Sequence, residues 1–350
     1  MSSLSCGIVG LPNSGKSTLF NALLKRQVAD VAEYPFTTVE PNTGVVEVPD
    51  KRLDKLVKVL KIPKKVPAVV KFIDIAGLIK GAHEGEGLGN RFLEQIRQAD
   101  AILHLVRGFT GNNIPHVSGE VDPVHDLSTV NLELTLADFE VVSKALEKPG
   151  RPEVLDKIKT ILGQGKPASE AGLSGKETEL VKDLNLLTLK PTLYALNLDE
   201  AAVKEAKEFP DLPPVMIISA KLEAEINELE LEDRLKYLEE LGLSQSLLDR
   251  LIERCYQLLD LITFYTIKGG KQAQAWPLAK TKTVLEAAEM VHTDFMAKFI
   301  KAEVVSFADF VNPPAGGGGW KRARELGKMR LEGKDYVMQD GDVVEFKIGG

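Results

Sequence analysis

The sequence of 350 residues predicts an α/β fold with two or three domains. Three observations lead to this prediction. Short apolar runs alternate with stretches of helical periodicity, a glycine-rich loop joins the first run to the first helical stretch, and from about residue 262 the apolar runs become short and β-rich. Strands that alternate with helices are typical of a parallel sheet covered by helices.

Composition narrows the class of protein. The chain is 44% hydrophobic and 27% charged with a net charge of −7, which fits a soluble globular protein and argues against a whole-chain nucleic-acid binder. Its two cysteines, Cys6 and Cys255, predict neither a disulfide framework nor a four-ligand zinc site. No signal-peptide pattern and no bilayer-length apolar run occur. We expect a cytoplasmic monomer without a membrane contact.

The first apolar run, residues 6–9, ends at a phosphate-binding pattern. Gly10-Leu-Pro-Asn-Ser-Gly-Lys-Ser-Thr18 matches G-x-x-x-x-G-K-[ST], and residues 19–24 continue with helical spacing. In such a loop the backbone N–H groups face phosphate oxygens at a helix N-terminus. Lys16 adds a charge at the β- and γ-phosphates, and the Ser17 hydroxyl reaches Mg²⁺. The predicted phosphate contacts are Asn13, Ser14, Gly15, Lys16, Ser17 and Thr18.

A second strand, residues 69–75, places further groups near the γ-phosphate. It contains Asp74, and the Asp-x-x-Gly pattern ends at Gly77. Such an aspartate holds Mg²⁺ through water, and the glycine N–H approaches the γ-phosphate. In the loop before this strand, either Thr37 or Thr38 could place its hydroxyl on the metal, and a threonine pair that merely satisfies a turn explains this stretch as well.

Two later strands end in motifs typical of base recognition. Residues 191–196 precede Asn197-Leu198-Asp199-Glu200, and residues 215–218 precede Ser219-Ala220-Lys221. In translation-factor-type GTPases the corresponding motifs read Asn-Lys-x-Asp and Ser-Ala-Lys. Four motifs in this order predict a P-loop nucleotide-binding domain of the GTPase type.

The chain resembles the Obg-like ATPases of the YchF subfamily, within the Obg family of translation-factor-type P-loop GTPases. The resemblance rests on the phosphate loop, on Tyr-Pro-Phe-Thr-Thr-Val-Glu-Pro-Asn (34–42), on the segment 74–90, and on 335–346, which is similar to the end of a TGS domain. It implies a Ras-like P-loop NTPase core, a helical coiled-coil insertion and a C-terminal β-grasp TGS domain. It also implies Mg²⁺ at Ser17 and Thr38, and a base contact at Leu198.

The base motif departs from the guanine-binding pattern. A short aspartate accepts both N1–H and the N2 amine of guanine, whereas this chain has the longer Glu200, and Leu198 replaces the usual lysine. Losing this pairing should erase the preference for guanine. The resemblance favours ATP as substrate, with Mg²⁺ as cofactor and GTP as the weaker ligand. The alternative is an ordinary GTPase in which a backbone shift lets Glu200 reach guanine.

The catalytic residue is less clearly marked. Ras-like enzymes place a water-orienting Gln directly after Asp-x-x-Gly, but this chain has Leu78 there. His83, in a glycine-rich stretch, is the nearest candidate, so the predicted catalytic set is Lys16, Gly77 and His83. A histidine exposed in a loop is the alternative interpretation. His104, within an apolar strand, is expected to be a satisfied core residue, and His116 and His125 to be loop residues.

We predict three structural parts. The P-loop domain comprises residues 1–127 and 188–262, the helical coiled-coil insertion residues 128–187, and the TGS domain residues 263–350. Leu132, Leu136, Phe139, Val142 and Leu146 predict an amphipathic helix in the insertion. An extended arm is expected there, with simple helix-on-sheet packing as the alternative. In the C-terminal part, residues 283–299 predict a helix between short strands.

A basic stretch in the C-terminal part suggests a partner. Cations beside an aromatic ring that is expected to be exposed suit RNA backbone contact with base stacking. A solvated charged face is the alternative. The ribosome or ribosomal RNA is the expected partner of an ATP-hydrolysing switch, and a nucleotide-dependent adaptor with negligible hydrolysis is the second hypothesis. The candidate RNA contacts are Trp320, Lys321, Arg322, Arg324, Lys328 and Arg330.

Overall fold

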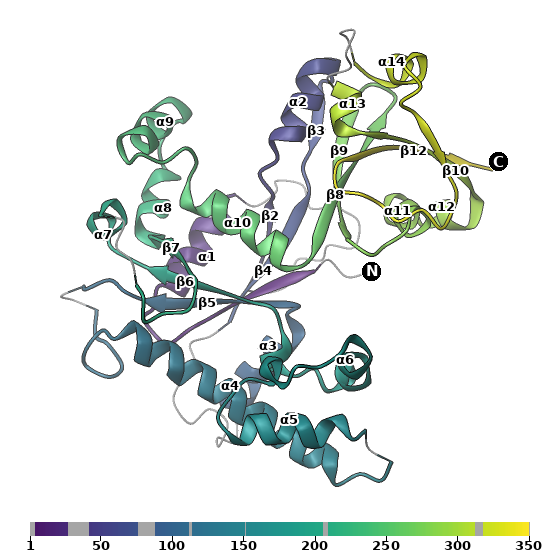
Figure 1. Ribbon diagram of the computed structural model, residues 1–350. Coiled ribbons are helices and arrows are strands. Elements are labelled where there is room, and N and C mark those ends of the chain that lie inside the picture. The colour runs from purple at the N-terminus through teal and green to yellow at the C-terminus, as the bar shows by residue number, and fades with distance from the viewer. Residues whose placement is uncertain are drawn as a thin grey trace.

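A computed structural model describes residues 4–26, 42–75, 88–111, 114–150, 152–205, 209–311 and 318–349. Its centre is a six-stranded sheet in the order β2-β4-β1-β5-β6-β7. All neighbouring strands pair in parallel except β2, which runs antiparallel to β4. Figure 1 shows this sheet between the helical insertion and the C-terminal domain. Its strands are β1 (Ser5–Val9), β2 (Thr43–Glu47), β4 (Val69–Asp74), β5 (Ala101–Arg107), β6 (Thr192–Asn197) and β7 (Val215–Ile218).

Helices cover both faces of this sheet because alternate residues of its buried strands point to opposite sides. On β1, Cys6 and Ile8 pack with α1, α2 and α10, whereas Val9 packs with α3 and α4. The helices of this domain are α1 (Lys16–Leu24), α2 (Lys51–Leu60), α3 (Leu88–Gln98), α4 (Pro123–Leu146), α7 (Glu200–Lys204), α8 (Ala220–Ile226), α9 (Leu231–Glu240) and α10 (Leu247–Leu258).

The long helix α4 serves two cores. Its first half packs on the sheet through Val130, Leu134 and Ala137, and its second half joins a separate small core through Val142. Helix-on-sheet packing and an arm are therefore combined in one helix. The predicted stripe was wrong at Leu132, which is 48% exposed, since the buried face runs through 127, 130, 134 and 137. The rest of the insertion consists of α5 (Val154–Gly163), α6 (Gly175–Val181) and short 3₁₀ turns.

A buried carboxylate closes the insertion onto α4. Asp138 accepts hydrogen bonds from the backbone N–H of Leu187 at 2.8 Å, and from the N–H and hydroxyl of Thr188, both at 2.7 Å. Burial raises the pKa of Asp138, and these hydrogen bonds oppose the increase. After α6 ends at Val181 the chain continues in short 3₁₀ turns, and its backbone at 187 and 188 turns back to bind this carboxylate.

The C-terminal domain has its own six-stranded sheet, in the order β11-β10-β12-β8-β9-β3. The predicted helix over 283–299 is broken at His292, whose extended backbone (φ −159°, ψ 134°) ends α11 and whose ring caps α12. Its elements are β8 (Leu261–Lys268), β9 (Gln272–Ala279), α11 (Val284–Val291), α12 (Thr293–Lys298), β10 (Phe299–Ser306), α13 (Phe307–Val311), α14 (Trp320–Glu325), β11 (Arg330–Glu332) and β12 (Asp342–Ile348).

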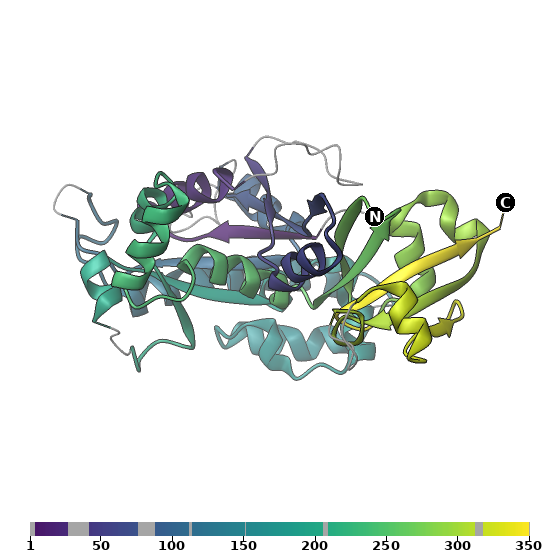
Figure 2. The same ribbon diagram turned by 90° about the horizontal axis from the view of Figure 1, so that it is seen from above.

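One strand of this sheet comes from far away in the sequence. β3 (Lys64–Val66) pairs in parallel with β9, with Lys64 opposite Gln272. Arg52 reinforces the junction through two hydrogen bonds to Asp340, at 2.6 and 3.2 Å. Figure 2 shows the C-terminal domain beside the end of the central sheet. The α2–β3 segment, which lies between β2 and β4 in the sequence, therefore joins the two sheets. β8 begins at Leu261, two residues before the predicted domain boundary at 263.

None of the helices in the described ranges is both long and apolar enough to cross a membrane.

Candidate functional site

The phosphate loop connects β1 to α1 as the sequence predicts. Gly15 caps α1 with φ 99°, and no side chain caps the helix, so the N–H groups of its first turn stay available to an anion. A Cβ atom at Gly15 would lie 2.2 Å from Asn197 Nδ2, so only glycine fits there. The loop is thus shaped by both backbone conformation and a contact from β6.

Lys16 lies inside this loop. Its Nζ donates to the carbonyl oxygens of Leu11 at 2.8 Å and Gly10 at 3.1 Å. Burial lowers the pKa of the Lys16 ammonium to about 8, and the nearby Asp74 carboxylate opposes the decrease. The Ser14 hydroxyl is buried without a hydrogen-bond partner. These groups are polar, desolvated and incompletely satisfied, as a phosphate site requires.

The residues near Lys16 also fit a magnesium ion. Ser17 at the start of α1 is exposed, and Asp74 lies half-buried at the end of β4, the neighbour of β1. Both offer the hard oxygen ligands that Mg²⁺ prefers. Within the described ranges no cluster of three His, Cys, Asp or Glu exists, so the donor set suits an ion shared with phosphates rather than an all-protein cage. The predicted Thr38, Gly77 and His83 lie outside the described residues.

Asn197 connects three loops. Its Nδ2 donates to the Ser14 carbonyl at 2.9 Å, and its Oδ1 accepts from the Ala220 N–H at 2.9 Å. The side chain is therefore committed to the protein on both ends. Asn197 thus holds the phosphate loop against the loops that follow β6 and β7, and its predicted base contact stays a prediction.

A pocket of about 460 Å³ extends from the phosphate loop along the base motifs. It brings together Gly15, Thr18, Asn197, Leu198, Glu200, Ser219, Ala220 and Lys221, all of them predicted from sequence. It also contains residues that the sequence did not single out, namely Phe109, Thr110, Gly111, Ile114, Asp199, Leu222 and Glu225. The one local signal for the first four was their place directly after a buried strand.

Glu200 has hydrogen-bond partners within the protein, in contrast to an aspartate that binds guanine. Its Oε1 accepts from Lys204 Nζ at 2.8 Å and from the Tyr237 hydroxyl at 3.1 Å. The hydrogen bond from Lys204, followed by that from Tyr237, lowers the pKa of Glu200. The carboxylate is therefore ionised and already bound. Leu198, 4% exposed, presents only carbon to the pocket.

The loop after β5 is pinned at several points. Arg107 donates to the carbonyls of Phe109, Ile114 and Pro115, and its guanidinium lies 4.5 Å from the Phe109 ring centre. His116, predicted as a loop residue without a partner, lies 2.9 Å through Nε2 from Asp126 Oδ2. Each of these two side chains is 3% exposed. The pocket wall is thus a fixed surface.

His104, by contrast, is a core residue that is not fully satisfied. It is 1% exposed on β5, and its Nδ1 has no hydrogen-bond partner. Burial, together with the charge of Lys16, lowers its pKa to about 3. In the folded protein, the imidazole therefore stays neutral near neutral pH.

This depressed pKa predicts a pH-dependent stability. Since the folded pKa lies below the unfolded value of about 6.5, stability is present above pH 6.5 and is lost as the pH falls towards 3. When the pH falls from 7 to 5, the free energy of unfolding of the wild type should decrease by about 2 kcal/mol more than that of His104→Leu. Urea unfolding at both pH values measures the difference. The exposed His125→Gln should behave as wild type, and parallel losses in His104→Leu and wild type would contradict the assignment.

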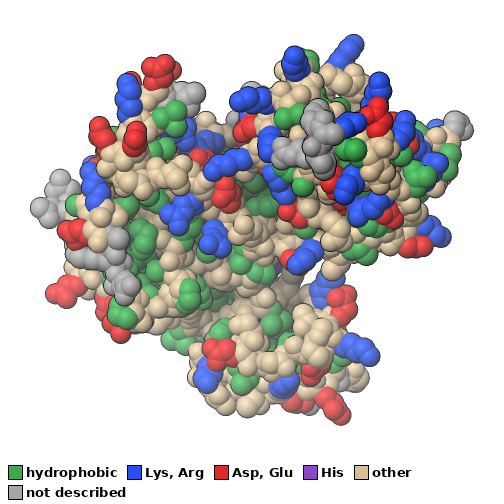
Figure 3. Space-filling view, turned by 45° about the horizontal axis from the view of Figure 1, so that its top comes forward, with side chains coloured by type: hydrophobic (Ala, Val, Ile, Leu, Met, Phe, Trp, Pro, Cys, Tyr) green, Lys and Arg blue, Asp and Glu red, His purple; other side chains and the backbone are tan. Residues whose placement is uncertain are grey.

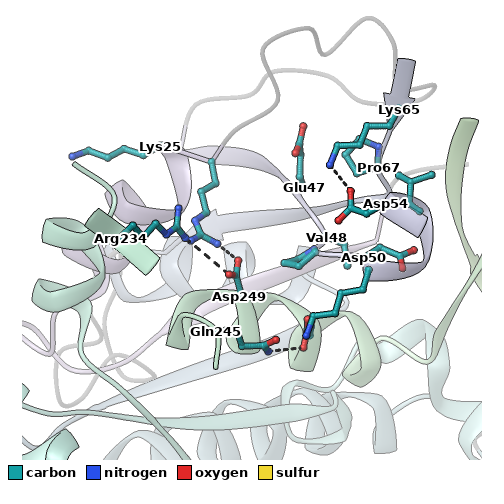
Figure 4. Close-up of a pocket in the computed structure, with 15 residues that line it drawn as sticks. Lys25, Glu47, Val48, Asp50, Asp54, Lys65, Pro67, Arg234, Gln245 and Asp249 are labelled. Carbon is teal, nitrogen blue, oxygen red and sulfur yellow. Dashed lines mark hydrogen bonds and ion pairs between the residues drawn. The ribbon is translucent and has the colours of Figure 1, made fainter. Parts of the chain in front are cut away.

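A second hollow, of about 640 Å³, lies between α2, α9, α10 and the end of α1. Figure 4 shows its charged side chains facing one another: Lys65 pairs with Asp54 at 2.6 Å, and Asp249 accepts from Arg26 and lies near Arg234. Because these charged side chains pair with one another, this hollow is a weaker candidate for the functional site than the pocket beside the phosphate loop.

The predicted RNA surface at α14 looks different in the structure. Trp320 is half-buried, at 5.0 Å and nearly perpendicular to Phe310, rather than exposed. Its neighbouring cations mostly face carboxylates, the pairs being Arg322–Glu325, Arg324–Glu303, Lys328–Asp309 and Arg330–Asp342. Lys321 is exposed and has no partner among the described residues.

Comparisons with known proteins cover both parts of the chain. Residues 5–142 match a family model described as a 50S ribosome-binding GTPase, and residues 261–349 match the YchF-GTPase C-terminal model, described as a protein of unknown function. The "Ribosome-binding ATPase YchF" of Bacillus subtilis is 46% identical, with 99% of each chain covered. This chain belongs to the YchF family. The YchF of Escherichia coli O157:H7 is 44% identical, over 97% of this chain and 98% of its own.

The YchF fold is shared over nearly the whole length. A solved structure of the Schizosaccharomyces pombe YchF GTPase superimposes with a TM-score of 0.85 at 32% identity, covering 99% of this chain and 98% of the yeast chain. The α/β class with a P-loop domain and a distinct C-terminal domain is confirmed.

Proposed function

We propose that this YchF protein is a nucleotide-dependent switch that binds ATP in preference to GTP, hydrolyses it with Mg²⁺, and associates with the ribosome or ribosomal RNA through its C-terminal domain. Hydrolysis is supported by the intact phosphate loop and by relatives named ribosome-binding ATPases. The observation that carries the ATP preference is the Glu200 carboxylate, which is held by Lys204 and Tyr237.

The proposed roles follow from the geometry. Backbone N–H groups at the start of α1 bind the phosphates, and Lys16 neutralises charge that develops on them. Ser17 and Asp74 would hold Mg²⁺, which on binding neutralises phosphate charge and orients the γ-phosphate. Asn197 keeps the phosphate loop and the base motifs in register. The base lies against Leu198 and the loop after β5.

Guanine gains less here than in a guanine-binding site, because Oε1 of the Glu200 carboxylate already accepts hydrogen bonds from Lys204 and Tyr237. Binding of guanine to Glu200 would compete with these two hydrogen bonds, and the Leu198 side chain supplies no acceptor. Adenine presents an acceptor at N1 and so gains nothing from a carboxylate there. The pocket therefore lacks the hydrogen bonds that favour guanine, and it gains no hydrogen bond that favours adenine.

Calorimetric titration with ATP and GTP tests this preference. ATP should bind more tightly, and GTP binding tenfold tighter, about 1.4 kcal/mol, would contradict the proposal. Leu198→Lys combined with Glu200→Asp should shift the preference towards GTP. Lys204→Ala combined with Tyr237→Phe should do so in part, because it releases Glu200. Glu225→Asp, at another carboxylate lining the pocket, is the matched control and should leave the ratio unchanged.

A further inference from the structure

A hollow of about 350 Å³ lies where α2 meets the C-terminal domain, well separated in sequence from the nucleotide motifs. Its walls are mainly apolar. Leu60 ends α2 and Ile62 lies two residues further on, Ile267 comes from β8, and Phe310 and Trp320 come from α13 and α14. Phe310 is fully buried and supports the half-buried Trp320 at 5.0 Å. The indole is thus fixed by packing while it also lines the hollow.

We call the exposed lysines next in sequence to its lining residues the rim of this hollow. Each of four exposed lysines is a direct sequence neighbour of a lining residue, and none has a carboxylate partner among the described residues; they are Lys61, Lys268, Lys271 and Lys321. The one acidic lining residue, Glu345, is bound to Lys347 at 2.6 Å. Figure 3 shows blue side chains gathered at its upper right, in the region of α2, α13 and α14.

These two features together select one class of ligand. An aromatic wall accepts the face of an unstacked base, and unpaired ammonium groups around it bind the phosphates on either side. A duplex keeps its bases stacked and paired, so it offers nothing for the hollow. The volume lies near the lower end of the roughly 300–1,000 Å³ range of small-ligand pockets, which suits one base rather than a stack.

We propose that this hollow binds single-stranded RNA, with one base against Trp320 and the flanking phosphates on the four rim lysines. The inference rests on the proposed ribosome or RNA association and names the surface and the state of the RNA. It differs from the prediction made from the α14 sequence alone, because Lys61 follows α2, Lys268 ends β8 and Lys271 lies in the turn before β9.

Tryptophan fluorescence gives the most direct readout. The chain has two tryptophans, and Trp276 is 6% exposed and stacked on Phe264. Titration of the full chain with a short, unlabelled single-stranded RNA of mixed sequence should quench the fluorescence of Trp320. The quench should disappear in Trp320→Phe, and a duplex RNA of the same sequence should quench weakly. Equal quenching by duplex and single strand would overturn the proposal.

The rim is tested by affinity at several salt concentrations. The rim variant replaces four lysines by Gln, namely Lys61, Lys268, Lys271 and Lys321. Its slope of log affinity against log salt should flatten by about 3, since each phosphate contact on a single strand contributes about 0.7. The matched control replaces four exposed lysines of the insertion by Gln, at Lys144, Lys148, Lys166 and Lys176, and should keep the slope. An unchanged slope in the rim variant would overturn the proposal.

The wall is tested by Trp320→Leu, which should weaken RNA binding at least fivefold, whereas Trp320→Phe should retain most of the affinity. If Trp320→Leu fails to fold, the rim variant decides, since all four of its lysines are exposed. ATP affinity should stay constant throughout.

Cosedimentation with ribosomes separates this proposal from the proposed function. If wild type binds RNA through the hollow but not ribosomes, only the ribosome association fails. If the rim variant loses ribosomes yet keeps RNA affinity, the hollow binds a protein and the RNA proposal is wrong.

Discussion

Replacing Lys16 by alanine should abolish Mg²⁺-dependent ATP hydrolysis, lowering kcat at least about 10²–10³-fold, the range for removing one preorganised donor to transition-state charge. The structure explains the size of this effect. Lys16 is 6% exposed and rests on two carbonyl oxygens inside the loop, so its charge reaches the phosphates with little solvent screening. Ser17→Ala should have a comparable effect on metal-dependent turnover, since it removes a proposed metal ligand.

Single-turnover hydrolysis with and without Mg²⁺ measures both variants. Lys25→Ala is the matched control, because this lysine directly follows the same helix but pairs with Glu228 on the surface. It should hydrolyse ATP at the wild-type rate. The emission of the buried Trp276 reports whether the C-terminal domain stays folded, which we expect in all three variants. Unchanged turnover in Lys16→Ala or Ser17→Ala would mean that this loop is not the active site.

The phosphate loop was predictable because its information is local. Strand, glycine turn and helix follow one another within about twenty residues, and backbone geometry then determines where the N–H groups point. The base motifs were located for the same reason. What the motifs did not reveal is that Asn197 is bound at both ends by the chain itself, since its partners Ser14 and Ala220 lie on other loops.

Features that depend on distant pairs could not be predicted. β3 has three residues, two of them lysines, and becomes a strand only because β9 offers an edge more than two hundred residues later. The basic stretch around α14 looked free in the sequence, but its cations meet Glu303, Asp309 and Asp342 from other elements. Tertiary context overrides local pattern in such cases.

The pocket wall after β5 illustrates a third limit. Phe109 to Ile114 has no periodicity, and its shape comes from Arg107, whose donors bind three carbonyls of the same loop. The sequence offered an arginine at a strand end and a glycine after it, without indicating that they belong to a ligand site. The pair His116–Asp126 was missed for the same reason. Asp126 lies in the first turn of α4, and only the folded chain brings it next to His116.

His83→Ala should lower kcat about 10²–10⁴-fold while leaving ATP affinity near the wild-type value, the magnitude typical of general acid–base or positioning roles. Leu78 cannot orient water, and His83 follows it in a glycine-rich segment. Among the described histidines, His104 is a poor alternative to His83 as the base. His104 is the histidine whose pKa the charge of Lys16 affects, yet it is buried and neutral, with a pKa of about 3, so it cannot accept a proton from the attacking water.

Because Asp74 is proposed to hold the metal, His83 is left to position or deprotonate the water, or to stabilise charge on the γ-phosphoryl oxygens. Single-turnover hydrolysis with ATP affinity determined in parallel tests the assignment. His125→Ala, at an exposed histidine on α4, is the control and should match wild type. Leu78→Gln in the His83→Ala background should not restore the rate, unless the water lies where Ras-like enzymes place it. Wild-type turnover in His83→Ala would leave catalysis to Lys16, the backbone amides and the metal.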